Sequence, residues 1–297
     1  GKEHIEVPSA IPGDICAVAK IDELHFDAVL HDSHDEDHHH LKSITFPPPM
    51  LGLAIRAEKR GDEQKLSEGL HRLVAEDPCV RVEHHTAQNE TVLYGLGDLH
   101  LRVMLQRLTE RYGVAVKTSP PSVPYRETIT RPAEGHYRHK KQTGGAGQFG
   151  EVYLRVEPAE RNSNPPLQYS WDVYGGTIPG QFEPAILKGV NDVMQSGPIA
   201  GFPMQDVKCS VYDGKHHPVD SKEVAFRAAG KGAFIDAIRK AKPALLEPIV
   251  NMEVTIPAEN VGDIAGDLSS KRGRVIGQDM LPGNFIVIKA QAPLSEV

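Results

Sequence analysis

A glycine-rich segment offers the most specific chemistry in this sequence. Residues 145–152 read Gly-Ala-Gly-Gln-Phe-Gly-Glu-Val and match the G-x-G-x-x-G-x-V loop that covers ATP phosphates in protein kinases. The rest of the chain excludes a kinase, because no Val-Ala-Ile-Lys lysine follows and no His-Arg-Asp or Asp-Phe-Gly motif occurs. A G-x-x-x-x-G-K-[ST] P-loop is also missing from the sequence, so we expect no nucleotide binding by that route.

Taken with its neighbours, the segment indicates an exposed loop suited to RNA. Residues 140–148 read Lys-Lys-Gln-Thr-Gly-Gly-Ala-Gly-Gln. Ammonium groups and free backbone amides suit phosphate and ribose hydroxyl groups, which do not report base identity. A glycine-rich hairpin turn without a ligand explains the same composition, and composition alone does not decide. The candidate residues are Gln142, Thr143, Gly144, Gly145, Ala146 and Gly147, beside a basic patch of Arg138, Lys140 and Lys141.

Residues 212–223 hold a second candidate site. Asp213-Gly214 is a turn signal, and Asp220 with Glu223 has the spacing of a capping box at the start of a helix. A turn followed by a cap would fix the side chains between them in a protruding position. Those side chains are Lys215, His216 and His217. An exposed histidine is most often a plain surface residue, which is the alternative here.

The sequence shows no catalytic constellation and no specific metal site. No Ser-His-acid arrangement stands out, and no His-Glu-x-x-His occurs. Cys16, Cys79 and Cys209 lie far apart without a Cys-x-x-Cys pair, which argues against a disulfide framework and a thiolate zinc site. Residues 31–40 contain five histidines and four acids but no apolar residue, and are expected to form a solvated loop. Metal binding is the alternative, since imidazole and carboxylate are both ligands.

Length and charge limit the possible classes. A chain of 297 residues predicts two to three domains, at roughly 100–150 residues each. With 39% hydrophobic and 25% charged residues, short apolar runs and no signal-peptide pattern, we expect a cytoplasmic protein without a membrane span. A net charge of −7 argues against a plain nucleic-acid binder, unless basic residues gather locally, as they do in 131–141.

Residues 50–117 alternate strand and helix patterns in one order. Apolar residues recur at helical spacing in 62–76 and 98–112, with Asp62 as the expected N-cap and Gly113 as the expected C-terminal stop. The expected strands are 50–57, 80–84, 91–96 and 114–117. This β-α-β-β-α-β order predicts a ferredoxin-like domain.

The remaining residues are expected to form a linker, a second domain and two partial ones. Residues 118–124, with three prolines, predict a hinge or linker. The second domain, about 125–246, has expected strands at 151–157, 168–173 and 206–212 and helices at 184–196 and 222–241. Residues 249–297 begin the ferredoxin-like order again, with a strand, a helix and two strands, and we expect a truncated domain whose hydrophobic face is poorly covered. Residues 1–45 hold short β-like runs such as 16–19.

Several of these segments together resemble the bacterial elongation factor G family. Their order and spacing fit the family along essentially the whole chain. The segments are Ala75-Glu-Asp-Pro78, Gly95-Leu-Gly-Asp-Leu-His-Leu101, Tyr125-Arg-Glu-Thr-Ile129, Gln142-Thr-Gly-Gly145, Gly175-Gly-Thr-Ile-Pro-Gly180, Leu245-Leu-Glu-Pro-Ile249, Gly262-Asp-Ile-Ala-Gly-Asp-Leu268 and Arg272-Gly273.

The resemblance implies an α+β, multidomain fold. Residues 1–45 would be the end of the β-barrel domain two, 46–124 the ferredoxin-like domain three, 125–246 domain four with a ribosomal-protein-S5-like α/β fold, and 247–297 a truncated domain five. The family's GTPase domain, which binds GTP and Mg²⁺, lies outside the match. For this chain itself we therefore expect no catalytic residues, no metal and no cofactor, and a monomer.

The resemblance also implies where the chain binds. In the family, domain four enters the small-subunit decoding centre of the ribosome with the tRNA–mRNA duplex, and domain five approaches large-subunit RNA. The two tip loops correspond to 142–147 and 214–220, and the tip histidine to His217. Ala146 and Pro218 depart from the housekeeping factor, which usually has an arginine and an acid there, so residues 213–220 are more similar to the elongation-factor-G-like paralogue.

The implied function is ribosome binding and GTP-dependent translocation of tRNA and mRNA by a parent translational GTPase. A role in ribosome recycling or a specialised condition is one alternative. An RNA-binding module that acts off the ribosome is another.

Overall fold

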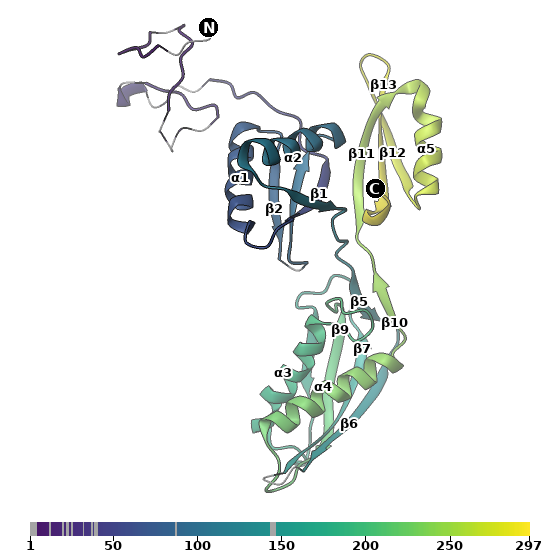
Figure 1. The fold of residues 1–297 in the computed structure, drawn as a ribbon. Helices are drawn as coiled ribbons and strands as arrows, with labels where there is room; N and C mark the ends of the chain where they lie inside the picture. The colour runs from purple at the N-terminus through teal and green to yellow at the C-terminus, as the bar shows by residue number, and fades with distance from the viewer. Residues whose placement is uncertain are drawn as a thin grey trace. The chain divides into compact units, whose positions relative to one another are not determined.

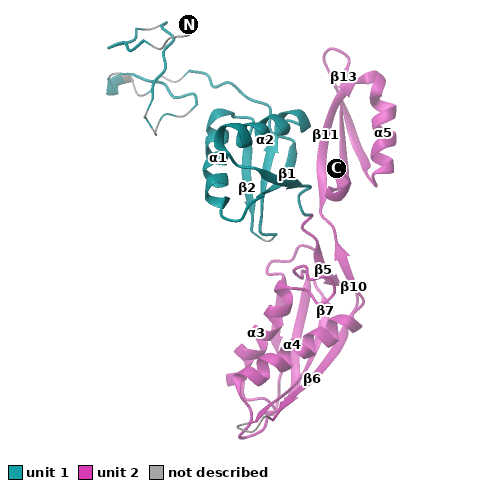
Figure 2. Cartoon of the chain, in the orientation of Figure 1, with its two compact units in different colours: residues 1–122 teal, residues 123–297 magenta. Residues whose placement is uncertain are grey.

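The chain divides into two compact units, residues 1–122 and residues 123–297 (Figure 2). The structure is a computed structural model that describes residues 5–11, 13–19, 21, 24, 26–31, 33–36, 38, 41–86, 88–142 and 147–297.

Unit 1 contains a four-stranded antiparallel sheet with two helices on one face (Figure 1). The sheet order is β2-β3-β1-β4, which is the ferredoxin-like topology that the sequence predicts. The elements are β1 (Leu51–Ala57), α1 (Glu63–Glu76), β2 (Arg81–His85), β3 (Glu90–Gly95), α2 (Asp98–Tyr112) and β4 (Val116–Ser119).

Both helices of unit 1 bury the apolar positions that their periodicity indicates. Leu66, Leu70 and Leu73 of α1 are buried against the sheet, and Leu101, Met104 and Leu108 of α2 join the same core. Each such side chain contributes about 1.5–3 kcal/mol through burial. Gly113 ends α2 with φ of 65°, as expected. Asp62 occupies the N-cap position of α1, as expected, but its side chain makes no capping hydrogen bond and lies 3.5 Å from Lys65 Nζ.

His100 joins two turns of unit 1. Its Nδ1 accepts a hydrogen bond from the Leu96 amide at 3.0 Å, and its Nε2 lies 3.1 Å from Asp77 Oδ2. The other Asp77 oxygen accepts the Cys79 amide at 2.8 Å. The motifs around Asp77 and His100 therefore have a structural use, because they hold the α1–β2 turn against the β3–α2 turn.

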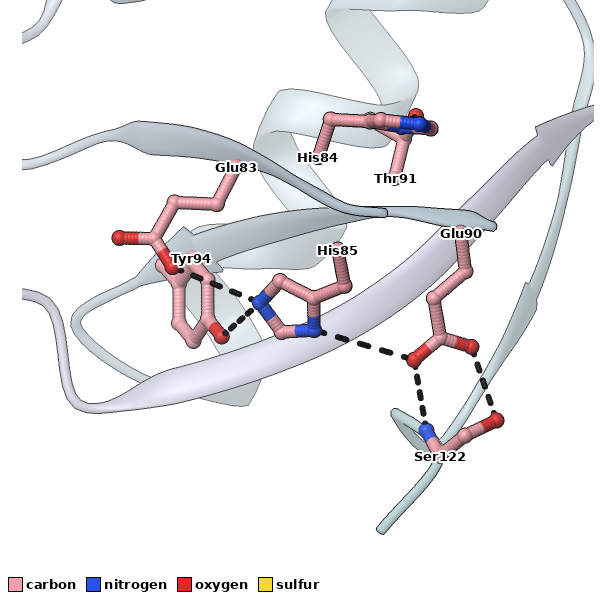
Figure 3. Close-up of polar contacts among 7 residues, drawn as sticks. All are labelled: Glu83, His84, His85, Glu90, Thr91, Tyr94 and Ser122. Carbon is pink, nitrogen blue, oxygen red and sulfur yellow. Dashed lines mark hydrogen bonds and ion pairs between the residues drawn. The ribbon is translucent and has the colours of Figure 1, made fainter. Parts of the chain in front are cut away.

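The open face of the unit 1 sheet carries a chain of polar contacts that reaches Ser122 (Figure 3). Glu90 of β3 accepts the Ser122 amide at 2.7 Å and the Ser122 hydroxyl at 2.9 Å. The His85 ring lies 4.0 Å from Glu90 through Nδ1, and 3.2 Å from the Tyr94 hydroxyl and 3.4 Å from Glu83 through Nε2. Burial raises the pKa of Tyr94, and the Glu83 charge raises it further. This chain of contacts fixes the last residue of unit 1 to its sheet.

The linker expected at 118–124 is therefore shorter than predicted. Thr118 and Ser119 belong to β4, where they pair with Ile55 and Ala54 of β1. Ser122 is held by Glu90. Residues 118–122 thus belong to the first unit, because their backbone and side-chain hydrogen bonds are made with its sheet.

The β-strand expected at residues 16–19 is not formed. Of the residues described before Leu51, none lies in a β-strand, and His34–Glu36 form a short 3₁₀ helix. Ile5, Val7, Ile11 and Ile15 in this region are all exposed. A strand needs hydrogen-bond partners on a neighbouring strand, and apolar side chains alone do not supply them. The assignment of residues 1–45 to a barrel domain stays a prediction.

The first part of unit 2 packs two helices on one face of a four-stranded sheet (Figure 1). The sheet order is β6-β7-β9-β8, in which only β8 and β9 run parallel. The elements are β5 (Arg126–Ile129), β6 (Ala133–Lys141), β7 (Gln148–Pro158), β8 (Leu167–Trp171), α3 (Glu183–Gln195), β9 (Val207–Lys215), α4 (Glu223–Lys240) and β10 (Pro243–Leu246). Strands β5 and β10 form a separate antiparallel pair.

A buried carboxylate organises the start of this fold. Glu127 is 1% exposed and accepts the backbone amides of Ile199, Ala200 and Phe202 at 3.1, 2.7 and 3.2 Å. Three charge-assisted hydrogen bonds offset the cost of burying the charge. The motif at residues 125–129 therefore stabilises the loop after α3.

The C-terminal part of unit 2 has the strand–helix–strand–strand order that the sequence predicts. Its elements are β11 (Ile249–Pro257), α5 (Val261–Ser270), β12 (Arg274–Leu281) and β13 (Phe285–Pro293), in the sheet order β11-β13-β12. The face under α5 is incompletely covered, as expected. Leu268, Ile288 and Ala290 are buried there, whereas Met280, paired with Ile286, is 85% exposed.

Candidate nucleic-acid interface

Two loops of unit 2 meet at one end of the β6–β7–β9 sheet (Figure 1). One joins β6 to β7, and the other joins β9 to α4. Between them lies a small cavity of about 220 Å³. Its lining residues are Lys140, Lys141, Gln142, Gly147, Gln148, Phe149, His217 and Asp220. Thr143, Gly144, Gly145 and Ala146 lie outside the described residues. We call this end the tip.

Short polar contacts hold the two loops together at the tip. The Phe149 amide donates to the Asp220 carbonyl at 2.9 Å, and the Ser221 hydroxyl donates to the Phe149 carbonyl at 3.0 Å. A Cβ on Gly147 would lie 2.7 Å from Asp220 Cγ, which is closer than real side chains come. A side chain at residue 147 would therefore require the Asp220 carboxylate to move. The sequence places these segments about 70 residues apart, and the sheet brings them together.

His217 projects from the second loop beside the cavity. Its side chain is 51% exposed, and its ring centroid lies 6.3 Å from that of Phe149. The ring Nδ1 lies 3.3 Å from the Val219 amide and 3.2 Å from the Asp220 amide, both of which donate to it. The ring thus caps the turn that carries it, as short polar side chains often do.

The neighbouring basic residues of this loop have other positions. The His216 Nδ1 donates to the Thr177 carbonyl at 3.0 Å, so this ring is committed to the loop before α3. Lys215 is the last residue of β9, opposite Glu151, and does not line the cavity. The capping box is also wrong: Lys222 is the residue before α4 and no side chain caps the helix. Asp220 instead belongs to the turn, where its backbone carbonyl binds Phe149.

The basic patch separates into two parts with different chemistry. Lys140 and Lys141 line the cavity. Arg138 donates from Nε to Glu151 Oε2 at 3.0 Å, and His136 Nε2 lies 2.8 Å from the other oxygen. Glu151 is 1% exposed. Burial by itself would raise the pKa of Glu151, but the hydrogen bonds from His136 and Arg138 outweigh it and hold the pKa below its ordinary value. Arg138 thus pairs with a buried acid, although its own side chain is about half exposed.

The sequence did not indicate Gln148, Phe149 or Ser221 as tip residues. The His139 Nε2 donates to the Gln148 amide oxygen at 3.0 Å, and the Phe149 ring lies near the His217 ring. An aromatic residue inside a glycine-rich loop is the signal that could have found Phe149. Ser221 gave no signal, because its contacts depend on the pairing of β7 with β9.

The described residues of the tip carry groups that can bind polar ligands. Two lysines face one acid in the cavity, with amide and imidazole donors beside them. Such donors suit phosphate and hydroxyl oxygens. Within the described ranges, no three His, Cys, Asp or Glu side chains are grouped to hold a metal ion. The helices described are all too short or too polar to cross a bilayer.

Comparisons with known proteins agree along the chain. The family "Elongation Factor G, domain III" matches residues 46–120, "Elongation factor G, domain IV" matches 121–242, and "Elongation factor G C-terminus" matches 244–297. An elongation factor G of Alteromonas mediterranea is 41% identical over 295 residues, which are 99% of this chain and 42% of the relative. An elongation factor G 2 of Vibrio cholerae is also 41% identical, over 293 residues, which are 98% of this chain and 41% of the relative.

A solved structure supports the same relationship. A crystal structure of a Thermus thermophilus protein superimposes with a TM-score of 0.71 at 42% identity, covering 86% of this chain and 38% of that one. This chain spans about 40% of the length of the relatives it matches. From the three family matches, we conclude that the chain belongs to the elongation factor G family and carries its domain III, domain IV and C-terminal domain.

Proposed function

We propose that this chain is the ribosome-binding part of a translational GTPase that promotes GTP-dependent translocation of tRNA and mRNA. The observation that supports it is the convergence of Lys140, Lys141 and His217 at one cavity at the tip. In this proposal the tip enters the small-subunit decoding centre, and the C-terminal domain approaches large-subunit RNA. GTP and Mg²⁺ are bound elsewhere in the parent protein, which acts as a monomer in the cytoplasm.

The chemistry of the tip fits a wedge against paired RNA strands. Small residues at 144–147 allow the backbone to come close to a shallow minor groove. Ribose 2′-hydroxyl groups in that groove offer contacts that do not depend on sequence. A translocase must act on every codon, so sequence-independent contacts are the kind that it needs.

Replacing His217 tests the site assignment. In single-round translocation by the full-length parent protein, His217→Ala should slow the step roughly ten-fold, because a hydrogen bond at the RNA contact is lost. His216→Ala is the matched control, since that ring bonds to Thr177 and not to the cavity. Equal rates for both variants and the parent would remove His217 from the site. Bulky replacements of Gly144 or Gly145 should act like His217→Ala, with little effect on folding.

The two alternatives are separable. Pro218 follows the tip histidine where the housekeeping factor usually has an acid, which favours a paralogue with a recycling or specialised role. The relatives named elongation factor G and elongation factor G 2 are equally identical to this chain, so sequence identity does not distinguish the two roles. Complementation of a cell that lacks its housekeeping factor decides the role: growth supports the translocase. An RNA-binding module off the ribosome would instead bind generic RNA and ribosomes alike.

A further inference from the structure

The Ser221 hydroxyl bridges the two loops of the tip. It accepts the His217 amide at 2.8 Å and donates to the Phe149 carbonyl at 3.0 Å. The Ser221 amide also donates to the His217 carbonyl at 3.2 Å. One side chain therefore links the backbone of His217 to the start of strand β7. Without the hydroxyl, both the His217 amide and the Phe149 carbonyl would lose this partner.

The contacts of the His217 ring fix which nitrogen carries the proton. Val219 and Asp220 both donate backbone N–H groups to Nδ1. A nitrogen that accepts two N–H donors cannot itself hold a hydrogen along those directions, so the neutral ring is protonated at Nε2. Asp220 Oδ2 lies 3.6 Å from Nδ1, which is too long for a competing hydrogen bond. Nε2 forms no hydrogen bond with any of the residues that the structure describes.

Pro218 supports the same arrangement. It follows His217 at the start of the 217–221 turn, where the fixed φ of proline suits a helical turn. Proline also has no N–H to compete for Nδ1, so Val219 and Asp220 remain its donors. The departure from the usual acid at this position thus makes the turn stiffer.

We propose that Ser221 is a positioning residue that holds His217 in its Nε2–H form, so that the tip histidine acts only as a hydrogen-bond donor. The inference rests on the proposed function and names the chemistry of the partner. That partner is an acceptor oxygen of RNA, either a phosphate or a ribose 2′-oxygen. A base nitrogen donor or any N–H group on the ribosome would not fit this position.

Nitrogen-15 NMR of the histidine rings in this chain tests the protonation state without the ribosome. The expected His217 spectrum has a proton on Nε2 and a lone pair on Nδ1. Ser221→Ala should broaden this resonance or mix the two tautomers, while Ser221→Thr, which keeps a hydroxyl, should preserve it. His136, whose ring contacts Glu151 in the same unit, is the internal control for intact folding. A proton on Nδ1 in the unaltered chain would overturn the inference, whatever the ribosome does.

Translocation by the full-length protein provides the second measurement. Ser221→Ala should slow the step roughly three- to ten-fold, the effect of one weakened hydrogen bond, and Ser221→Thr should restore most of the rate. An unchanged rate in Ser221→Ala, with His217→Ala slow, would overturn the positioning role and leave the proposed function standing. An unchanged rate in His217→Ala would instead refute the site itself.

Codons with 2′-deoxynucleotides distinguish the two acceptors. If the acceptor is a ribose oxygen, the deoxy codon should abolish the difference between the parent protein and His217→Ala. If it is a phosphate, the difference should remain. A His217→Gln variant, which keeps an N–H donor near the position of Nε2, should lose less rate than His217→Ala in both cases. Equal loss in His217→Gln and His217→Ala would contradict the donor role.

Discussion

Neighbouring basic residues at the tip have different roles, because they differ in the charged groups beside them. Arg138, Lys140 and Lys141 form one run of positive charge in the sequence. In the fold, Arg138 lies opposite a buried acid on the neighbouring strand, whereas the two lysines reach the cavity. The role of each basic residue therefore depends on which residue lies opposite it in the sheet, and the register of the strands sets that pairing.

Glu151 supports a prediction about pH and stability. Its pKa is lower in the folded chain than in the unfolded one, so its ion pairs stabilise the fold fully at neutral pH, and the stabilisation is lost as pH falls through the folded pKa. Glu151→Gln keeps the shape and removes the charge that binds Arg138 and His136. We expect a loss of about 1–3 kcal/mol in the free energy of unfolding at neutral pH.

Chemical denaturation at neutral and acid pH measures this. The parent chain and Glu151→Gln should differ at neutral pH and converge in acid, where the parent's carboxyl is protonated as well. Glu157→Gln, on the same strand but without a hydrogen bond to a basic side chain among the described contacts, is the control. A difference that persists unchanged in acid would mean that packing, and not charge, explains the effect.

At the scale of elements, the sequence predicts helices and strands whose large apolar residues recur periodically. It does not predict strands whose buried positions hold small residues. Strand β6 was recognised only as a basic stretch, because its inward positions include Ala133 and Gly135 in place of large apolar residues. A Cβ on Gly135 would lie 2.1 Å from the Ala233 carbonyl of α4. The backbone of α4 occupies the space that a larger strand side chain would fill. The sequence of β6 therefore lacks the alternation of apolar and polar residues that predicts a strand.

The same limit applies to the candidate site. His217 and the lysines were identified from residue type and from the family resemblance. Ser221 and Phe149 were not, since a hydroxyl that bridges two loops has no signature in either loop alone. The helices of unit 1, by contrast, were predicted within one or two residues, because their burial follows a local period.

The contact between Glu90 and Ser122 gives a prediction for the end of unit 1. Glu90→Ala removes the acceptor for both the amide and the hydroxyl of Ser122. We expect faster hydrogen exchange of the Ser122 amide, with little change in the buried amides of β3, because an exposed contact is lost and the core is untouched. Amide exchange read by NMR measures both.

Glu83→Ala is the matched control for that experiment. Glu83 contacts His85 in the same cluster but not Ser122 (Figure 3). It should leave the Ser122 amide protected. If both variants speed exchange equally, the whole His85 cluster, and not Glu90 alone, holds the segment. If neither does, Ser122 is protected by its backbone surroundings.

At the scale of the whole molecule, the proposed RNA binding has to come from a small basic region of an acidic chain. The net charge is −7, so long-range attraction to RNA is weak and the local contacts decide. In the proposed function, Lys140, Lys141 and His217 at the tip provide those contacts.

Salt dependence separates this arrangement from a general basic surface. Each lysine that neutralises a phosphate adds close to one unit to the slope of log binding constant against log salt. Lys140→Ala with Lys141→Ala should therefore reduce the slope for ribosome binding by about two. Arg138→Gln should reduce it far less, because Glu151 already neutralises that guanidinium. Filter binding of the full-length protein over a salt series measures each slope. A fall as large in Arg138→Gln as in the lysine variants, or equal slopes on ribosomes and on unstructured RNA, would favour a generic RNA-binding surface over a built contact at the tip.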